Sequence, residues 1–179
     1  MTPPDRIWSV PVRVDDIPEG GRHFELHADP AMFAALARAA AVESVSRLDA
    51  VFDLTRYGSG GVAVVGTVSA SVRQACVVTL DPVDNEVEEI VDLVFVPARE
   101  AAAAAGAATH EATDGPDLEA LVDGIIDLGG VATEFLILGI DPYPRKPDAV
   151  FAAPSAGEGA AHPFAALADL AKGKGDGGS

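Results

Sequence analysis

SRLDAVFDLTRYGSGGVAVVGTVSASVRQACVVTL, residues 46–80, contains two strand-like segments joined by a glycine-rich turn. From Ser46 to Tyr57 apolar and polar residues alternate, which is typical of a strand with one buried face. Gly58-Ser-Gly-Gly61 turns the chain into the second segment, Val62 to Leu80, and the pair predicts a β-hairpin. Nineteen residues at about 3.3 Å each exceed the usual strand length, so we expect a bend or bulge, with Gly66 as the candidate.

Further strands are expected on both sides of this hairpin. Residues 8–14 and 23–27 alternate with period two, and these two strands could pair with each other. After the hairpin, four apolar residues share one parity with acidic residues between them: Val87, Val91, Leu93 and Phe95. The middle of the chain therefore predicts an antiparallel, twisted sheet.

Two helices are expected to cover this sheet. Asp29-Pro30 supplies an N-cap and a proline at the first helical position, which predicts a helix over residues 30–42. Asp127 can cap a second helix, over residues 127–139, whose apolar stripe consists of Leu128, Val131, Phe135 and Leu138. The alanine-rich residues 101–109 predict a loop or a frayed helix. The expected fold class is α+β, a single domain with a mainly antiparallel twisted sheet packed by two or three helices.

The chain changes character after the second helix. Residues 141–147, DPYPRKP, are too rich in proline for a helix or a central strand, and a Gly/Ala/Ser linker follows them. Residues 162–172 predict a short amphipathic helix ahead of a frayed tail. We therefore expect a domain over residues 1–150, and a flexible arm of linker, short helix and tail over residues 151–179.

The net charge of the chain indicates which classes of partner it can bind. The net charge is −16, and residues 74–144 hold fifteen acidic residues against one basic residue, Arg99. Such a surface repels phosphate backbones, because nucleic-acid affinity comes largely from lysine and arginine. Direct RNA contact is therefore expected to be weak or absent, and a basic protein is the natural partner. An acidic surface can also simply keep a protein soluble.

The compartment follows from cysteine content and hydropathy. A single cysteine excludes a disulfide within the chain, and the opening residues MTPPDR have neither the basic start nor the apolar run of a signal peptide. The most apolar windows are short or interrupted by charge, so no membrane span is expected. We expect a cytoplasmic protein.

The sequence contains no specific pattern for catalysis or for a metal site. His23, Glu25 and His27 share one face of a strand, but residues i and i+4 lie about 13 Å apart, too far for ligands of one zinc ion. The turn at residues 58–61 lacks the Gly-Lys-Ser/Thr ending of a phosphate loop, and no Gly-x-Ser-x-Gly elbow is present. We expect no enzyme activity, no cofactor and no metal.

Cys76, the single cysteine, leaves several roles open. It could be a nucleophile, a redox sensor, a metal ligand or a small apolar residue in the core. By parity it shares the apolar face of its strand with Val72 and Val78. Burial there would raise the pKa of the thiol. The expected role is that of a core filler.

Three motifs then occur in a characteristic order. They are GTVSA at residues 66–70 with QACVVTLDP at 74–82, IDLGGVATEFLIL at 126–138, and DPYPRKP at 141–147 with HPFAAL at 162–167. In this order and spacing the chain from Val62 to the C-terminus resembles the YceD family, the large ribosomal RNA subunit accumulation proteins. The DPYPRKP form resembles an alphaproteobacterial branch of that family. The N-terminal third matches only in length and pattern.

The resemblance implies a non-catalytic role in 23S rRNA accumulation and in assembly of the large ribosomal subunit. The family-motif residues that it implies are Cys76, Leu80, Pro82, Asp127, Leu128, Glu134 and Leu138. Many members carry Cys-x-x-Cys in the first motif and further cysteines near the third, a set compatible with zinc. Thr79 stands at the second of these positions and residues 143–147 hold no cysteine, so Cys76 resembles the remnant of a metal-binding pair.

The expected mechanism is docking of a basic ribosomal protein or large-subunit assembly factor. The candidate contacts are Asp81, Asp84, Glu86, Glu88 and Glu89 in the acidic segment, Pro142, Tyr143, Pro144, Arg145 and Lys146 in the proline-rich segment, and Pro163, Phe164 and Leu167 in the tail. Phe164 could instead pack back on its own sheet. Two alternatives stay open: weak RNA binding through Arg145, Lys146, Lys172 and Lys174, or an acidic binding module unrelated to ribosomes.

Overall fold

The computed structural model describes residues 7–107 and 117–151 and confirms an α+β fold with a mainly antiparallel sheet. The strands are β1 Pro11–Arg13, β2 Arg22–His27, β3 Ser44–Tyr57, β4 Gly61–Ala75, β5 Pro82–Pro97, β6 Asp117–Leu121 and β7 Ile125–Asp127. The helices are α1 Phe33–Ala39, α2 Ala98–Ala107 and α3 Leu128–Leu138, with 3-10 turns at Val14–Asp16 and Pro30–Met32. The main sheet has the order β2-β3-β4-β5-β6, and β1 pairs with β7 in a second, two-stranded sheet.

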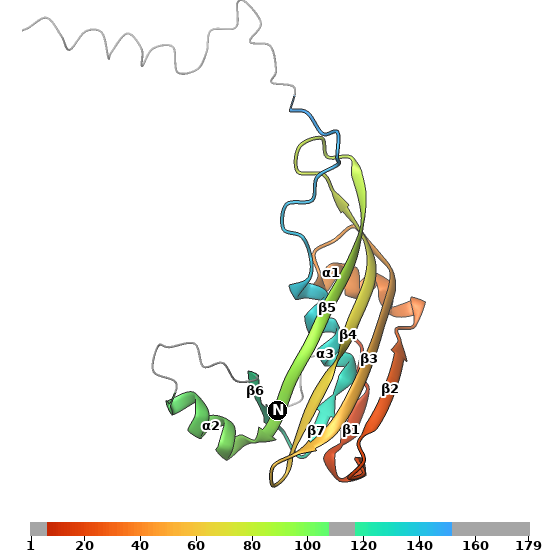
Figure 1. The fold of residues 1–179 in the computed structure, drawn as a ribbon. Coiled ribbons are helices and arrows are strands. Elements are labelled where there is room, and N and C mark those ends of the chain that lie inside the picture. The colour runs from red at the N-terminus through yellow and green to blue at the C-terminus, as the bar shows by residue number, and fades with distance from the viewer. Residues whose placement is uncertain (1–6, 108–116, 152–179) are drawn as a thin grey trace, which may run out of the picture. The chain divides into compact units, whose positions relative to one another are not determined.

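The predicted hairpin forms the centre of the main sheet. Strands β3 and β4 pair antiparallel around the turn, and β5 pairs antiparallel with the length of β4 (Figure 1). The expectation of a bend or bulge at Gly66 was wrong, because the register runs through this residue on both sides without a break. The irregularity lies in β3, between Val45 and Arg47. Strand β4 also ends at Ala75 instead of Leu80, because the chain turns after Cys76.

The outer strands pair differently from the option that the sequence suggested. Strand β1 pairs with β7, β2 pairs with β3, and no ladder joins β1 to β2 within the described residues. Strands β6 and β7 were not predicted, and β6 runs parallel to β5. The signal for the turn between them was Asp123-Gly124, a favoured pair for a two-residue turn. Both residues have positive φ, and the Ile125 N–H donates to the Val122 carbonyl oxygen at 3.0 Å.

Both predicted helices are present. The first begins with a 3-10 turn, in which the Asp29 side chain accepts from the Ala31 N–H, and the α-helix then ends at Ala39. Asp127 caps α3 by accepting from the Gly130 N–H, as predicted. The apolar stripe of α3 is buried only in its first half, since Leu138 is 68% exposed. For the alanine-rich segment the helix alternative is confirmed as α2, and residues 108–116 lie outside the described residues.

The core lies between one face of the main sheet and a layer that includes α1, α3 and β1. Its largest fully buried side chains include Phe52, Ile17, Leu36, Leu128 and Leu136. Each such side chain stabilises the fold by about 1.5–3 kcal/mol relative to an exposed position. Figure 1 shows β2 to β5 in front of α1 and α3, so the opposite face of the sheet is turned toward the viewer.

Some expectations fall outside this part of the chain. The helix predicted over residues 162–172 and most of the arm at 151–179 lie outside the described residues. The domain boundary at residue 150 stays a prediction. Within residues 7–107 and 117–151, no helix is long and apolar enough to cross a membrane.

Candidate functional site

The first and third sequence motifs meet at the end of β4. The Val77 N–H donates to the Pro144 carbonyl oxygen at 2.9 Å, and the buried Gln74 amide donates to the Asp141 carbonyl oxygen at 2.8 Å. At the same place Lys146 Nζ lies 3.1 Å from Asp81 Oδ2. We call residues 74–82 and 141–146 the tip, because these contacts join the two motifs into one unit.

Cys76 is enclosed within the tip and is fully buried, but its side chain is not part of the core of the main sheet. The Thr79 hydroxyl, the Lys146 backbone N–H and the Thr79 backbone N–H donate to the thiol, and together they lower its pKa to about 6. The expected rise in pKa was therefore wrong, because these donors outweigh the effect of burial. The expected role of a core filler stays a prediction, since Cys76 is buried but lies outside the main hydrophobic cluster. Cys76 is a hydrogen-bond acceptor that ties the turn after β4 to the proline-rich segment.

The other candidate residues of the tip are mostly exposed. Leu80 is 78% exposed at a φ of 62°, and Tyr143 is 73% exposed. Pro82, Pro142 and Arg145 are also exposed, whereas Pro144 is buried and Lys146 is half-buried beside Asp81. Pro163, Phe164 and Leu167 lie outside the described residues.

The face of the main sheet that is turned away from α1 and α3 is strongly acidic, and we call it the open face. Its outward side chains on β2 to β5 are His23, Glu25, His27, Arg47, Asp49, Val51, Asp53, Val65, Thr67, Ser69, Ser71, Arg73, Asp84, Glu86, Glu88, Ile90 and Asp92. This set contains seven carboxylates and two arginines. Beyond Asp92 this face of β5 is no longer exposed, since Val94 and Val96 are buried.

Part of this negative charge is compensated within the sheet. Arg73 binds Asp84 with two hydrogen bonds of 2.6 and 3.0 Å, and Arg47 contacts both Asp49 and Glu86 at 2.8 Å. The Arg73 hydrogen bond lowers the pKa of Asp84, and hydrogen bonds from Ser71 and Arg47 lower the pKa of Glu86. The charges of Asp84 and Glu86 are therefore less available to a partner.

Two histidines pair with carboxylates of the open face, Asp53 and Asp49, the second of which also binds Arg47. His23 Nδ1 lies 2.7 Å from Asp53 Oδ1, and His27 Nδ1 lies 2.7 Å from Asp49 Oδ1. The hydrogen bond with Asp53 is the largest cause of a raised pKa at His23. Each of the two histidines thus has its own carboxylate, which agrees with the large separation of the histidines along the strand.

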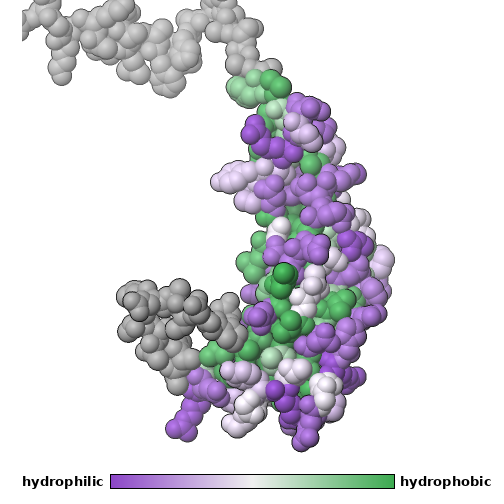
Figure 2. Space-filling model, viewed as in Figure 1, coloured by the Kyte–Doolittle hydropathy of each residue, from purple (hydrophilic) through white to green (hydrophobic). Residues whose placement is uncertain are grey.

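Two carboxylates of the open face have no such compensation. Among the described residues, no cationic side chain lies within ion-pair distance of Glu88 or Asp92. Between them on β5 stands Ile90, which is 77% exposed, with Val51 and Val65 partly exposed on neighbouring strands. Figure 2 shows hydrophobic patches on a mainly hydrophilic surface in this view. The result is an apolar patch flanked by free carboxylates.

The acidic candidates from the sequence are thus divided among three places. Asp84, Glu86 and Glu88 lie together on the open face, whereas Asp81 lies at the tip. Glu89 lies on the opposite face, where its side chain contacts Gly139 at the end of α3. Three further carboxylates of the open face were missed: Glu25, Asp49 and Asp53. Only the strand register places them beside the acidic segment.

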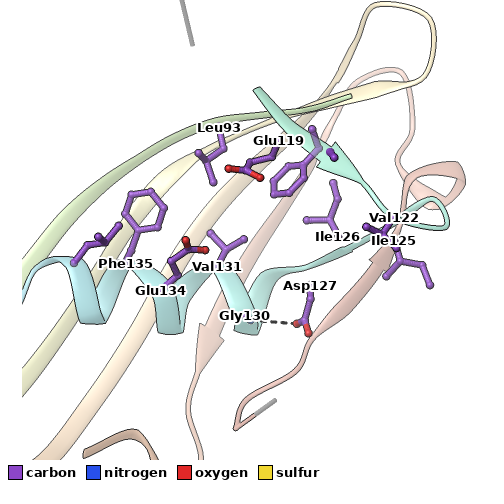
Figure 3. A pocket seen from close by; sticks show the side chains of 13 residues that line it. Leu93, Glu119, Val122, Ile125, Ile126, Asp127, Gly130, Val131, Glu134 and Phe135 are labelled. Carbon is purple, nitrogen blue, oxygen red and sulfur yellow. Dashed lines mark hydrogen bonds between the residues drawn. The ribbon is translucent and has the colours of Figure 1, made fainter. Parts of the chain in front are cut away.

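A groove lies on the covered side of the sheet, between α3 and the strands β5 and β6 (Figure 3). Its volume is about 410 Å³. Three of the family-motif residues line it, Asp127, Glu134 and Leu138, while Leu128 is fully buried. The Asp127 carboxylate accepts from Ser9 Oγ at 2.8 Å and from the Val10 N–H at 2.7 Å, besides capping α3. Its role is therefore structural.

Comparison with known families supports the resemblance carried by the three sequence motifs. A family model described as "Large ribosomal RNA subunit accumulation protein YceD" matches residues 64–171, more than half of the chain. The chain belongs to the YceD family. The matched region of this YceD chain includes the tip, the groove helix α3 and the whole of the acidic strand β5. No curated protein and no solved structure matches the chain.

Proposed function

We propose that this chain supports accumulation of the large-subunit ribosomal RNA as a non-catalytic assembly factor, and that it binds a basic ribosomal or assembly protein on the open face. Membership of the YceD family supports the process. The charge and shape of the open face support the kind of partner. The proposal places the protein in the cytoplasm, without a membrane partner.

The observation that carries the binding mode is the patch around Ile90. An exposed apolar centre supplies buried area to a complex, and the free carboxylates Glu88 and Asp92 beside it favour lysine or arginine on the partner. Like charge on a phosphate backbone is repelled by the same groups. Direct RNA contact through this face is therefore weak or absent in the proposal.

The experiment uses cells that lack the gene and are complemented with variants. Glu88→Lys/Asp92→Lys reverses the two free charges of the open face. Asp15→Lys/Asp16→Lys makes the same change of charge in the exposed 3-10 turn outside that face, and serves as the matched control. Sucrose-gradient sedimentation gives the ratio of large to small subunits, and the gradient fractions give the large-subunit rRNA precursor.

We expect a deficit of large subunits without the gene, which the wild type and the control restore and the open-face variant does not. A normal profile without the gene would contradict the role in assembly. Full restoration by the open-face variant would leave the role standing and refute docking on this face. In the purified system, binding to large-subunit proteins should weaken with added salt, because exposed charges are screened.

A further inference from the structure

We propose that the groove between α3 and β5–β6 binds a basic amphipathic helix of another protein. The groove is lined by apolar residues together with the carboxylates of Glu119, Asp127 and Glu134, and its volume of about 410 Å³ lies within the usual range of ligand sites. This surface is on the covered side of the sheet, away from the open face. The proposal therefore does not depend on the ribosomal role.

The apolar residues of α3 that line the groove have the spacing needed to pack against another helix. Val131, Phe135 and Leu138 follow one another at i, i+4 and i+7, so they form a single stripe along the groove. The stripe becomes more exposed toward the end of α3, where Leu138 is 68% exposed. At the other end of the groove Val122 is 67% exposed. A partner helix can lay its own apolar stripe between these two ends.

The charge of the groove selects the partner. Figure 3 shows the carboxylates of Glu119 from β6 and Glu134 from α3 on the two sides of the space. Among the described residues neither has a cationic side chain within ion-pair distance. Lysine or arginine on both flanks of an apolar stripe would meet these two carboxylates. An acidic helix or a phosphate backbone would meet repulsion instead.

The test is an NMR titration of the isotope-labelled full chain with a synthetic helix of leucine and lysine, about 18 residues long so that it forms a helix. A second peptide with glutamate in place of lysine is the control for charge. The variant Glu119→Gln/Glu134→Gln removes the two groove charges. Glu19→Gln/Glu43→Gln removes two exposed carboxylates that lie outside both the groove and the open face, and is the matched control protein.

We expect the lysine peptide to shift the amide signals of groove residues such as Leu93, Val131 and Phe135, and the glutamate peptide to shift none. The groove variant should bind about tenfold more weakly, the loss expected for two partly exposed ion pairs, and the Glu19→Gln/Glu43→Gln control should bind as the wild type does. Equal weakening in both variants, or shifts confined to the open face, would reduce the effect to general attraction between charges and overturn the proposal. A groove already occupied by a second copy or by another segment of the chain would also overturn the proposal. In the first case Leu138→Ser would dissociate a dimer. In the second case it would shift amide signals in the absence of peptide.

Discussion

The ring of Phe52 occupies the space above Gly66, its direct partner in the β3–β4 ladder. A Cβ atom on Gly66 would lie 2.8 Å from Phe52 Cδ1 and still closer to the Val51 carbonyl oxygen. Phe52 is fully buried in the core. Glycine at position 66 therefore allows a close approach between two regular strands, and no bulge is needed.

Substitution Gly66→Ala should destabilise the protein by about 3 kcal/mol, because the added methyl group meets a backbone atom that cannot move without disturbing the ladder. Gly20→Ala is the control, since a Cβ there meets nothing within 4 Å. That change should stay within about 0.5 kcal/mol of the wild type. Urea unfolding measures both. Equal stability of the two variants would mean that β3 and β4 separate easily at this point.

The case of Gly66 shows how far the sequence predicts this fold. Alternation identified the strands β3, β4 and β5, and capping residues identified α1 and α3, because both signals are local. The cause of the glycine was not local, since it depends on which residue of β3 lies opposite. Strand β6 was not predicted, for a related reason. It joins the sheet by parallel pairing with β5, and periodicity within a segment does not reveal which distant strand it pairs with.

The same limit applies to the candidate site. The acidic residues of β5 were predicted as one contact surface. Successive side chains of a strand point to opposite faces, however, so Glu88 lies on the open face and Glu89 on the side of α3. By alternation Cys76 has the parity of the core residues, although the chain turns immediately after this residue. Its hydrogen-bond donors come from its own turn, chiefly Thr79, and from Lys146 of the proline-rich motif, which lies more than sixty residues farther along the chain.

Asp127 should be the most costly of the capping residues to remove. Asp127→Ala eliminates the cap on Gly130 and also the hydrogen bonds to Ser9 and Val10, so the expected loss is about 3 kcal/mol. Asp29→Ala, the control, eliminates a single exposed cap on Ala31 and should cost about 1 kcal/mol. Thermal or urea unfolding of both variants tests the difference. Similar losses would show that the link to the N-terminal segment contributes little.

His23 should titrate above its ordinary range, because its pKa is raised chiefly by the hydrogen bond with Asp53. A raised pKa in the folded state stabilises the fold below the unfolded pKa of about 6.5, and this contribution is lost as pH rises through the folded value. Asp53→Asn should lower the pKa of His23. Asp92→Asn removes a charge from the same row of the sheet without touching His23, and should lower it less. NMR titration of the imidazole protons measures all three proteins, and identical curves would contradict the assignment.

The Cys76 thiol should be ionised at neutral pH, since donors from Thr79 and Lys146 lower its pKa to about 6. The ultraviolet absorbance of the thiolate, followed against pH, measures this value directly. Thr79→Val removes the hydroxyl donor and should raise the pKa of Cys76. Thr67→Val, on the open face of β4, is the matched control and should leave it unchanged. A pKa near that of free cysteine, about 8.5, in the wild type would refute the hydrogen-bonded arrangement at the tip.

The same shift predicts how stability depends on pH. Because the pKa of Cys76 is lower in the folded than in the unfolded chain, the unfolded chain binds more protons between about pH 6 and pH 8.5. Its contribution to stability is therefore fully present above about pH 8.5 and is lost as pH falls through about 6. Urea unfolding of the wild type and of Cys76→Ser at several pH values should show their difference growing toward alkaline pH. A difference that is constant, or that grows toward acidic pH, would mean that the thiol is neutral and that Thr79 and Lys146 do not stabilise a thiolate.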